Sequence, residues 1–155
     1  MPAKANPSKP DAATLLALDK QVCFALYSAS LAMTKLYKPL LAELGLTYPQ
    51  YLAMLALWEQ DAQTVSELGQ RLLLDSGTLT PLLKRLEVLG LLQRQRSSED
   101  ERRVHLHLTA AGRKLKVRAA QIPACVLAAS QCSVSELVAF NRQVRQFRAL
   151  LLHAH

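Results

Sequence analysis

The sequence contains few aromatic residues, only five glycines and only three cysteines. Aromatic side chains make up 5% of the 155 residues while 50% of the residues are hydrophobic, so we expect a mainly aliphatic core. An odd number of cysteines does not suit a framework of structural disulfides and leaves thiols free to react. No P-loop, GxGxxG or HExxH motif occurs, so the common cofactor-dependent classes are disfavoured and we expect neither a cofactor nor a metal.

A long apolar run is also missing. The longest uncharged apolar stretch covers residues 22–33, about half of the roughly 20 residues that a membrane-spanning helix requires. Residues 1–13 are rich in Pro, Ala and Lys but lack the apolar core of a signal peptide. The sequence therefore predicts a disordered N-terminal arm, followed at 14–155 by one domain of a cytoplasmic protein that does not contact membranes.

Two capped helices are predicted from residue 64 onward. Thr64 and Glu67 form a capping box, so a short helix should begin at Val65. Asp75 is a suitable N-cap for a second helix, which Gly90 should end. This second helix carries one stripe of leucines: Leu79, Leu82, Leu83, Leu86 and Leu89.

A basic hairpin follows the two helices. Residues 91–96 and 102–108 alternate as two strands around the polar loop 97–100. This order predicts a winged helix-turn-helix, in a mainly α fold with a small β-hairpin wing. Ten of the 19 Lys and Arg residues lie between Lys84 and Arg118, so the positive charge of this +7 chain gathers where DNA would lie.

The predicted DNA-binding face lies opposite the leucine stripe and continues onto the wing. Small, polar and cationic side chains of this kind suit a major groove, although a solvated basic surface would have the same composition. The candidate residues are Ser76, Gly77, Thr78, Thr80, Pro81, Lys84 and Arg85 on the helix, and Arg94, Arg96, Asp100, Arg102 and Arg103 on the wing.

Helices are also predicted on the N-terminal side of this unit. An amphipathic helix over 15–36 should be broken or kinked by Pro39, with Gly45 ending the next turn. Thr47 and Gln50 then form a second capping box for a helix that reaches residue 58.

On the C-terminal side, residues 109–130 should form one helix kinked by Pro123, and a capping box at Ser133 should start a last helix to about residue 152. The terminal helices have more apolar surface than one small domain can cover, which predicts a homodimer on a pseudo-palindromic operator. We therefore assign 14–46 and 113–155 to dimerisation and 47–112 to the DNA-binding lobe.

Two histidines lie on the predicted wing. His105 and His107 are two residues apart on a strand, so they share one face and could in principle share a metal ion. A protein metal site normally has three or four ligands, and no Cys, Asp or Glu cluster is evident in the sequence nearby. Packing or a weakly pH-dependent charge is the simpler interpretation.

Cys23 lies in the first predicted helix, with Tyr27 one turn later. Tyr37 and Tyr48 flank the turn that brings the next helix back. A phenol that donates a hydrogen bond to sulfur stabilises the thiolate over the thiol and favours attack by peroxide. The spacing alone favours a small buried cysteine among ordinary core tyrosines.

Asp100-Glu-Arg102 and the strand ending in Leu108-Thr109-Ala-Ala-Gly112 resemble the wing signature of the MarR family. CFALYSASLAMTKLYKPLLAELGLTYPQYLAMLALWE and LDSGTLTPLLKRLE are similar to the organic-hydroperoxide-responsive (OhrR-type) branch, over about residues 15–120. The resemblance implies that Cys23 is the peroxide sensor, that Tyr37 and Tyr48, with Tyr27 a further candidate, hydrogen-bond to it, and that Arg102, oriented by Asp100, reaches the minor groove.

The resemblance also implies a second cysteine, contributed by the partner subunit after the wing. Cys125 is favoured because it lies on a predicted helix, and Cys132, in a predicted turn, is the alternative. We therefore expect a repressor that is not an enzyme, binds operator DNA when reduced and leaves it when organic hydroperoxide oxidises Cys23 to an intersubunit disulfide. The alternatives are a MarR-type sensor of small aromatic or anionic ligands and, from another class, a thiol peroxidase.

Overall fold

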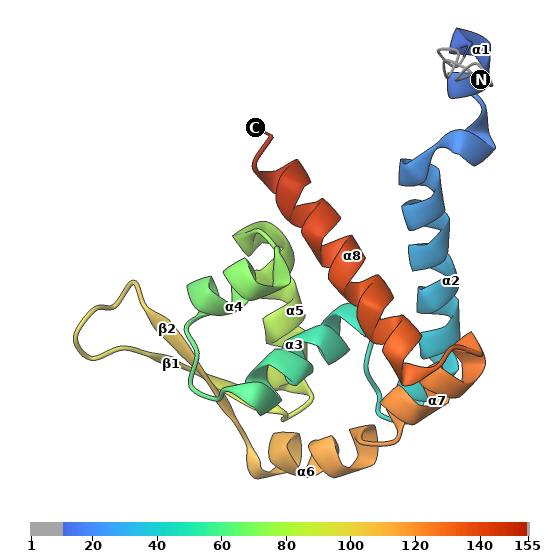
Figure 1. Cartoon of the computed structure of the whole chain (residues 1–155). Helices are drawn as coiled ribbons and strands as arrows, with labels where there is room; N and C mark the ends of the chain where they lie inside the picture. Colours follow the sequence, from blue (N-terminus) through green and yellow to red (C-terminus); the bar gives the residue numbers. More distant parts are fainter. Residues whose placement is uncertain (1–10, 155) are drawn as a thin grey trace, which may run out of the picture.

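The computed structural model describes residues 11–154, in which helices surround one antiparallel hairpin (Figure 1). Residues 1–10 of the predicted arm lie outside the described residues. The elements in chain order are α1 (Ala12–Leu15), the 3-10 helix η1 (Leu18–Lys20), α2 (Val22–Ala42), α3 (Tyr48–Glu59), α4 (Val65–Leu72), α5 (Ser76–Val88), β1 (Leu92–Arg96), β2 (Val104–Leu108), α6 (Ala110–Ala119), α7 (Ile122–Ser130) and α8 (Val134–Leu152).

The lobe from α3 to β2 is a winged helix-turn-helix, as predicted. α3, α4 and α5 pack on one another, β1 packs on α5, and β2 packs on α4. The two strands pair antiparallel, with Leu92 opposite Leu108 and Arg96 opposite Val104. Each fully buried leucine stabilises the lobe by roughly 1.5–3 kcal/mol. These leucines include Leu57, Leu68, Leu79, Leu83, Leu86, Leu92 and Leu106.

Short-range hydrogen bonds start the helices where the sequence predicts. Thr47, Thr64 and Ser133 each complete a capping box with the residue three positions later. Asp75 accepts a hydrogen bond of 2.8 Å from a backbone N–H in the first turn of α5. α4 closes at Leu73, whose φ of 56° is left-handed, and the chain then turns directly into α5.

The leucine stripe of α5 is shorter than predicted. Leu89 follows the last residue of α5 and is 43% exposed, so its assignment to the buried stripe is wrong. Gly90 has a φ of +73°, which turns the chain before another helical turn can form, and Leu91 is buried instead.

The loop of the wing is longer than predicted, because β2 begins at Val104 and not at residue 102. The Asp100 carbonyl oxygen accepts the backbone N–H of Arg103 at 2.9 Å, and its carboxylate accepts that of Arg102 at 3.0 Å. These bonds form a tight turn at the tip of the hairpin, and the Arg103 carbonyl still accepts the Ser97 N–H across the hairpin at 2.8 Å.

The first long helix begins later than predicted. In place of one helix from residue 15, α1 and η1 precede α2, and Ala17 and Gln21 are extended. The Gln21 side-chain amide donates to the backbone carbonyls of Leu15 and Ala17, which satisfies acceptors that a continuous helix would bond internally.

Pro39 does not break α2, which continues to Ala42. The fixed φ of proline is compatible with a helix, so α2 continues although Pro39 provides no backbone donor for the Lys35 carbonyl. After Ala42 the chain turns at Gly45, whose φ is +69°, with the Leu46 N–H bonded to the Leu41 carbonyl at 3.1 Å.

The helix predicted over 109–130 is two helices. α6 ends at Ala119 and α7 begins at Ile122. Pro123 lies in the first turn of α7, where a backbone N–H would have no partner within the helix, so its absence breaks no hydrogen bond. In one continuous helix Pro123 would leave the Ala119 carbonyl without its hydrogen-bond donor.

The terminal helices are largely exposed. Among the described residues, α8 has none that is buried and α2 has only Leu41. In Figure 1 α8 and the N-terminal half of α2 diverge from each other above α7. Within 11–154 no single helix is long and apolar enough to cross a membrane, although Ala110–Ser130 and Val134–Leu152 together, bent by 94°, have sufficient length and apolar composition.

Candidate DNA-binding face and redox site

The exposed side of α5 carries all seven helix residues of the predicted DNA-binding face. Ser76, Gly77, Thr78, Thr80, Pro81, Lys84 and Arg85 are exposed, while Leu79, Leu83 and Leu86 point into the core. α4 packs behind α5, so the small residues of the first turn and the two cations of the last turns project from one surface.

The wing extends this surface away from the lobe (Figure 1). Arg94, Arg96, Asp100, Arg102 and Arg103 are all exposed. The Asp100 carboxylate accepts the backbone N–H of Arg102, and among the described residues it makes no ion pair with the Arg102 guanidinium. A cleft of about 510 Å³ separates the wing from the helices. Its lining includes Ser66, Glu67, Thr80, Arg94, Arg102 and Arg103.

Arg94 also has a partner inside the lobe. Its Nε donates to Glu87 Oε2 at 2.9 Å and its backbone N–H donates to Glu87 Oε1 at 3.2 Å. These hydrogen bonds from Arg94 hold the pKa of Glu87 below its ordinary value. Arg94 therefore joins β1 to α5 as well as adding charge to the predicted face.

An aromatic cluster lies at the junction of α2 and α3. The ring centroid of Tyr37 is 4.9 Å from that of Tyr48 and 5.8 Å from that of Tyr51, and Tyr51 is 6.4 Å from Trp58. Burial, and then the neighbouring phenols of Tyr48 and Tyr51, raise the pKa of Tyr37 to about 12. Tyr37 therefore keeps its proton at neutral pH and can donate a hydrogen bond.

The structure does not bring Cys23 to these phenols within one chain. Cys23 is exposed in the first turn of α2, and Tyr37 is fourteen residues later on the same helix, about 21 Å along its axis. Tyr27 is one turn from Cys23 and is 62% exposed. A hydrogen bond from Tyr37 or Tyr48 to the Cys23 sulfur would therefore have to cross between subunits.

The other two cysteines are exposed near the C-terminal end of the fold. Cys125 lies in α7, and Cys132 follows α7 with its thiol donating to the Ser130 carbonyl at 3.4 Å. α7 packs against α2 and lies at the end of α2 opposite to Cys23 (Figure 1). An approach of Cys23 to Cys125 would therefore also have to cross between subunits.

Sequence reasoning missed two members of the aromatic cluster. Tyr51 is buried one turn after Tyr48, and the i, i+3 spacing is the signal that places both phenols on one side of α3. Trp58 Nε1 donates to the Gly112 carbonyl at 2.9 Å, which links α3 to the base of the wing. No sequence signal predicts this bond between residues far apart in the chain.

The histidines of the wing lie together, as the strand spacing predicts. The ring centroids of His105 and His107 are 6.4 Å apart. In the part of the chain that the structure describes, no three His, Cys, Asp or Glu side chains lie close enough to hold a metal ion.

Comparison with known proteins identifies the family. A model of the family described as transcriptional regulator SarA/Rot matches residues 35–118, more than half of the chain. The chain is 54% identical over 120 residues to the organic hydroperoxide resistance transcriptional regulator of Bacillus subtilis (strain 168). This match covers 77% of the chain and 82% of the relative.

Solved structures agree with this assignment. AbfR of Staphylococcus epidermidis has a TM-score of 0.74 at 34% identity, covering 88% of this chain and 94% of AbfR. Reduced AbfR bound to DNA has a TM-score of 0.66 at 36% identity, and the match covers 86% of this chain and 93% of AbfR. Disulfide-formed AbfR has a TM-score of 0.59 at 35% identity, and the match covers 84% of this chain and 91% of AbfR. The chain thus belongs to the MarR family of winged-helix transcriptional regulators, in its organic-hydroperoxide-responsive branch.

Proposed function

We propose that this protein is a dimeric, redox-sensing repressor that binds operator DNA when reduced and leaves it when organic hydroperoxide oxidises Cys23. The observation that carries the proposal is an exposed Cys23 at the start of α2, a helix in which only Leu41 is buried, in a chain whose opposite side is a basic winged helix. The relative's role in organic hydroperoxide resistance and the DNA-bound and disulfide states of AbfR support it.

A homodimer would cover the exposed apolar faces of the terminal helices. α7 and α8 line a groove of about 960 Å³, with apolar Leu127, Leu137 and Val138 among its lining residues. Removing apolar surface from water stabilises a protein by about 25 cal/mol per Å². In a single chain these faces stay in water, so this stabilisation requires a second chain. We therefore assign 14–46 and 113–155 to dimerisation and 47–112 to the DNA-binding lobe.

The proposed sensing chemistry has two steps. The Cys23 thiolate attacks the terminal oxygen of the hydroperoxide, the O–O bond breaks, and the product alcohol leaves with a proton. The thiolate of Cys125 of the partner subunit then attacks the sulfenic sulfur, which forms the disulfide and releases water. In each subunit of the dimer, Tyr37 and Tyr48 would donate to the sulfur of the opposite Cys23.

Disulfide formation requires the two α-carbons to approach within roughly 7 Å, so the helices that carry them must shift. A shift between dimerisation helices would re-space the two α5 helices on successive major grooves. A difference of about 1–3 kcal/mol in DNA binding, about 5- to 150-fold, is enough for a switch. The protein would act as a regulator and not as an enzyme, in the cytoplasm where the DNA is.

Fluorescence anisotropy with labelled operator DNA tests this function. The reduced protein should bind, one equivalent of cumene hydroperoxide per Cys23 should release it, and dithiothreitol should restore binding. Continued binding to DNA after stoichiometric oxidation, together with release by a small aromatic acid, would replace redox sensing with ligand sensing.

The docking face predicts the effect of two substitutions. Arg102→Ala should weaken operator binding about tenfold or more, because Arg102 projects from the wing turn and has no side-chain partner among the described residues. Lys84→Ala should lower the slope of log DNA affinity against log salt concentration by about one unit if Lys84 contacts a phosphate. Lys114→Ala on α6 is the matched control for loss of one charge, and equal affinities of all three variants would discard the face.

The phenols predict a change in oxidation rate. Tyr37→Phe and Tyr48→Phe should each slow oxidation of Cys23 several-fold while DNA binding persists, because each removes a donor and keeps the ring packing. A hydrogen bond to a charged group contributes about 1.5–3 kcal/mol. Stopped-flow oxidation measures the rate, Tyr51→Phe is the control within the cluster, and unchanged rates in both test variants would make Tyr37 and Tyr48 structural only.

A further inference from the structure

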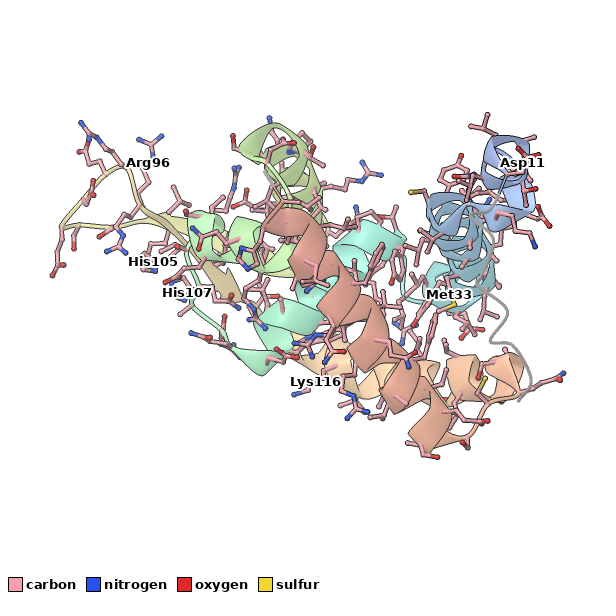
Figure 2. All side chains as sticks on the ribbon, turned by 45° about the horizontal axis from the view of Figure 1, so that its top comes forward. Asp11, Met33, Arg96, His105, His107 and Lys116 are labelled. Atoms are coloured by element: carbon pink, nitrogen blue, oxygen red, sulfur yellow. The ribbon has the colours of Figure 1, made fainter. Side chains whose placement is uncertain are left out.

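The outer face of the wing has no part in the function proposed above. Strand alternation places Arg94 and Arg96 on the same side as Leu92, whereas His105 and His107 lie on the other side, opposite Gln95 and Gln93 of β1. Figure 2 shows both histidines on the hairpin, with Arg96 nearer its tip. This side of the ladder is therefore built from imidazoles and neutral amides.

The structure orients one of these imidazoles as a ligand. His105 Nδ1 lies 3.2 Å from the Ala62 carbonyl oxygen. A carbonyl oxygen only accepts, so in the neutral ring Nδ1 carries the proton and Nε2 keeps its lone pair. Metal-binding histidines are commonly held in this way by a backbone carbonyl. The segment after Ala62 lies along the same edge of β2, where Thr64 forms an isolated bridge with His105 and the Leu106 N–H donates to the Gln63 carbonyl at 2.8 Å.

The second imidazole lies beside the first. The two rings are inclined by only 29°, with centroids 6.4 Å apart, and both side chains are partly exposed. A cavity of about 300 Å³ opens next to them, and its lining includes Gln95, Ser97 and Glu99. Among the described residues His107 has no side-chain hydrogen bond, so its ring can turn toward a shared ion.

We propose that His105 and His107 together bind one divalent transition-metal ion on the outer face of the wing. Imidazole is a good ligand for Zn²⁺, Ni²⁺ and Cu²⁺. The bond between a zinc ion and a histidine nitrogen is about 2.0–2.1 Å long. Since no third His, Cys, Asp or Glu is close enough among the described residues, water completes the coordination. The site is therefore exchangeable, and an ion bound there would lie next to Arg96, which lines the same cavity.

Spacing alone favours packing or a pH-dependent charge for these histidines. The bond from His105 to Ala62 is what distinguishes a ligand pair, because it fixes the ring and the tautomer before an ion arrives. Pre-organisation of this kind lowers the entropic cost of binding.

Isothermal titration with NiCl₂ tests the site, since Ni²⁺ binds imidazole without oxidising thiols. The background protein carries His153→Gln and His155→Gln, because these are the other two of the four histidines. In this background His105→Gln and His107→Gln should each lower Ni²⁺ affinity about tenfold or more. Even the loss of a residue that only hydrogen-bonds to a metal ligand lowers metal affinity by about this factor. The three cysteines stay in every variant, so the differences report the histidines.

Ni²⁺ should also raise the unfolding temperature of the background protein and not that of the double variant His105→Gln/His107→Gln. Unfolding temperatures without Ni²⁺ show whether each variant is folded. Equal Ni²⁺ affinity of the background and the double variant would overturn the proposal. Loss of binding in only one of the two single variants would also overturn it, since a lone imidazole would then be the ligand.

Discussion

Cys23→Ser should bind operator DNA as tightly as the parent protein and stay bound when organic hydroperoxide is added. Serine has nearly the same volume as cysteine but cannot form a sulfenic acid, so the first chemical step is lost. Cys23 is exposed and makes no contribution to the buried core, so the substitution should leave the fold intact. Anisotropy with labelled operator before and after one equivalent of cumene hydroperoxide measures the effect.

The other two cysteines provide matched controls. Cys125→Ala should still be oxidised at Cys23 but should not form the covalent dimer on a non-reducing gel, whereas Cys132→Ala should form it. A covalent dimer that persists in Cys125→Ala and disappears in Cys132→Ala would assign the second step to Cys132. Release of Cys23→Ser from DNA by hydroperoxide would disprove the redox mechanism.

Gly112→Ala should destabilise the protein by about 2–3 kcal/mol. A β-carbon at residue 112 would lie 2.1 Å from the Leu91 carbonyl oxygen, closer than any real contact. That oxygen cannot move easily because it accepts the Thr109 N–H at 3.1 Å. Residue 112 is itself held by bonds of 3.0 Å to Thr109 Oγ1 and 2.9 Å from Trp58 Nε1. Overpacking of this kind costs about 1–3 kcal/mol or more.

Helix propensity acts in the opposite direction at this position. Alanine is favoured over glycine within a helix by about 1 kcal/mol, so a clash-free site would become more stable. Ala111→Gly, at the exposed neighbouring position of α6, measures that propensity alone. Urea unfolding at one protomer concentration compares the two variants. A Gly112→Ala protein at least as stable as the parent would show that the approach to Leu91 is not tight.

Most of the lobe could be predicted because its signals are short-range. Thr47 with Gln50, Thr64 with Glu67, and Asp75 with the first turn of α5 are three residues or fewer apart, so their hydrogen bonds depend little on the rest of the fold. The leucine periodicity of α5 likewise decides which side of that helix is buried, and hence which side is left for DNA.

Helix ends without a local cap were predicted less well. The sequence alone favours a continuous helix through residue 21 and a break or kink at Pro39, but the structure interrupts the helix before Val22 and continues it past Pro39 to Ala42. The choice depends on whether the Gln21 side chain or the backbone satisfies the carbonyls of residues 15 and 17. Propensity does not decide between these alternatives, because their difference in free energy is small.

By itself the sequence determined the winged helix-turn-helix, the exposed basic side of α5 and the presence of Cys23 near the start of a long helix, since capping and periodicity act over a few residues. Only the tertiary structure decided that α7, which carries Cys125, packs against α2, that Trp58 bonds to Gly112, and that His105 bonds to Ala62. These relations join residues distant in the chain, and their geometry depends on how whole elements pack. For the same reason the proposed meeting of Cys23 with phenols and a second thiol requires two chains.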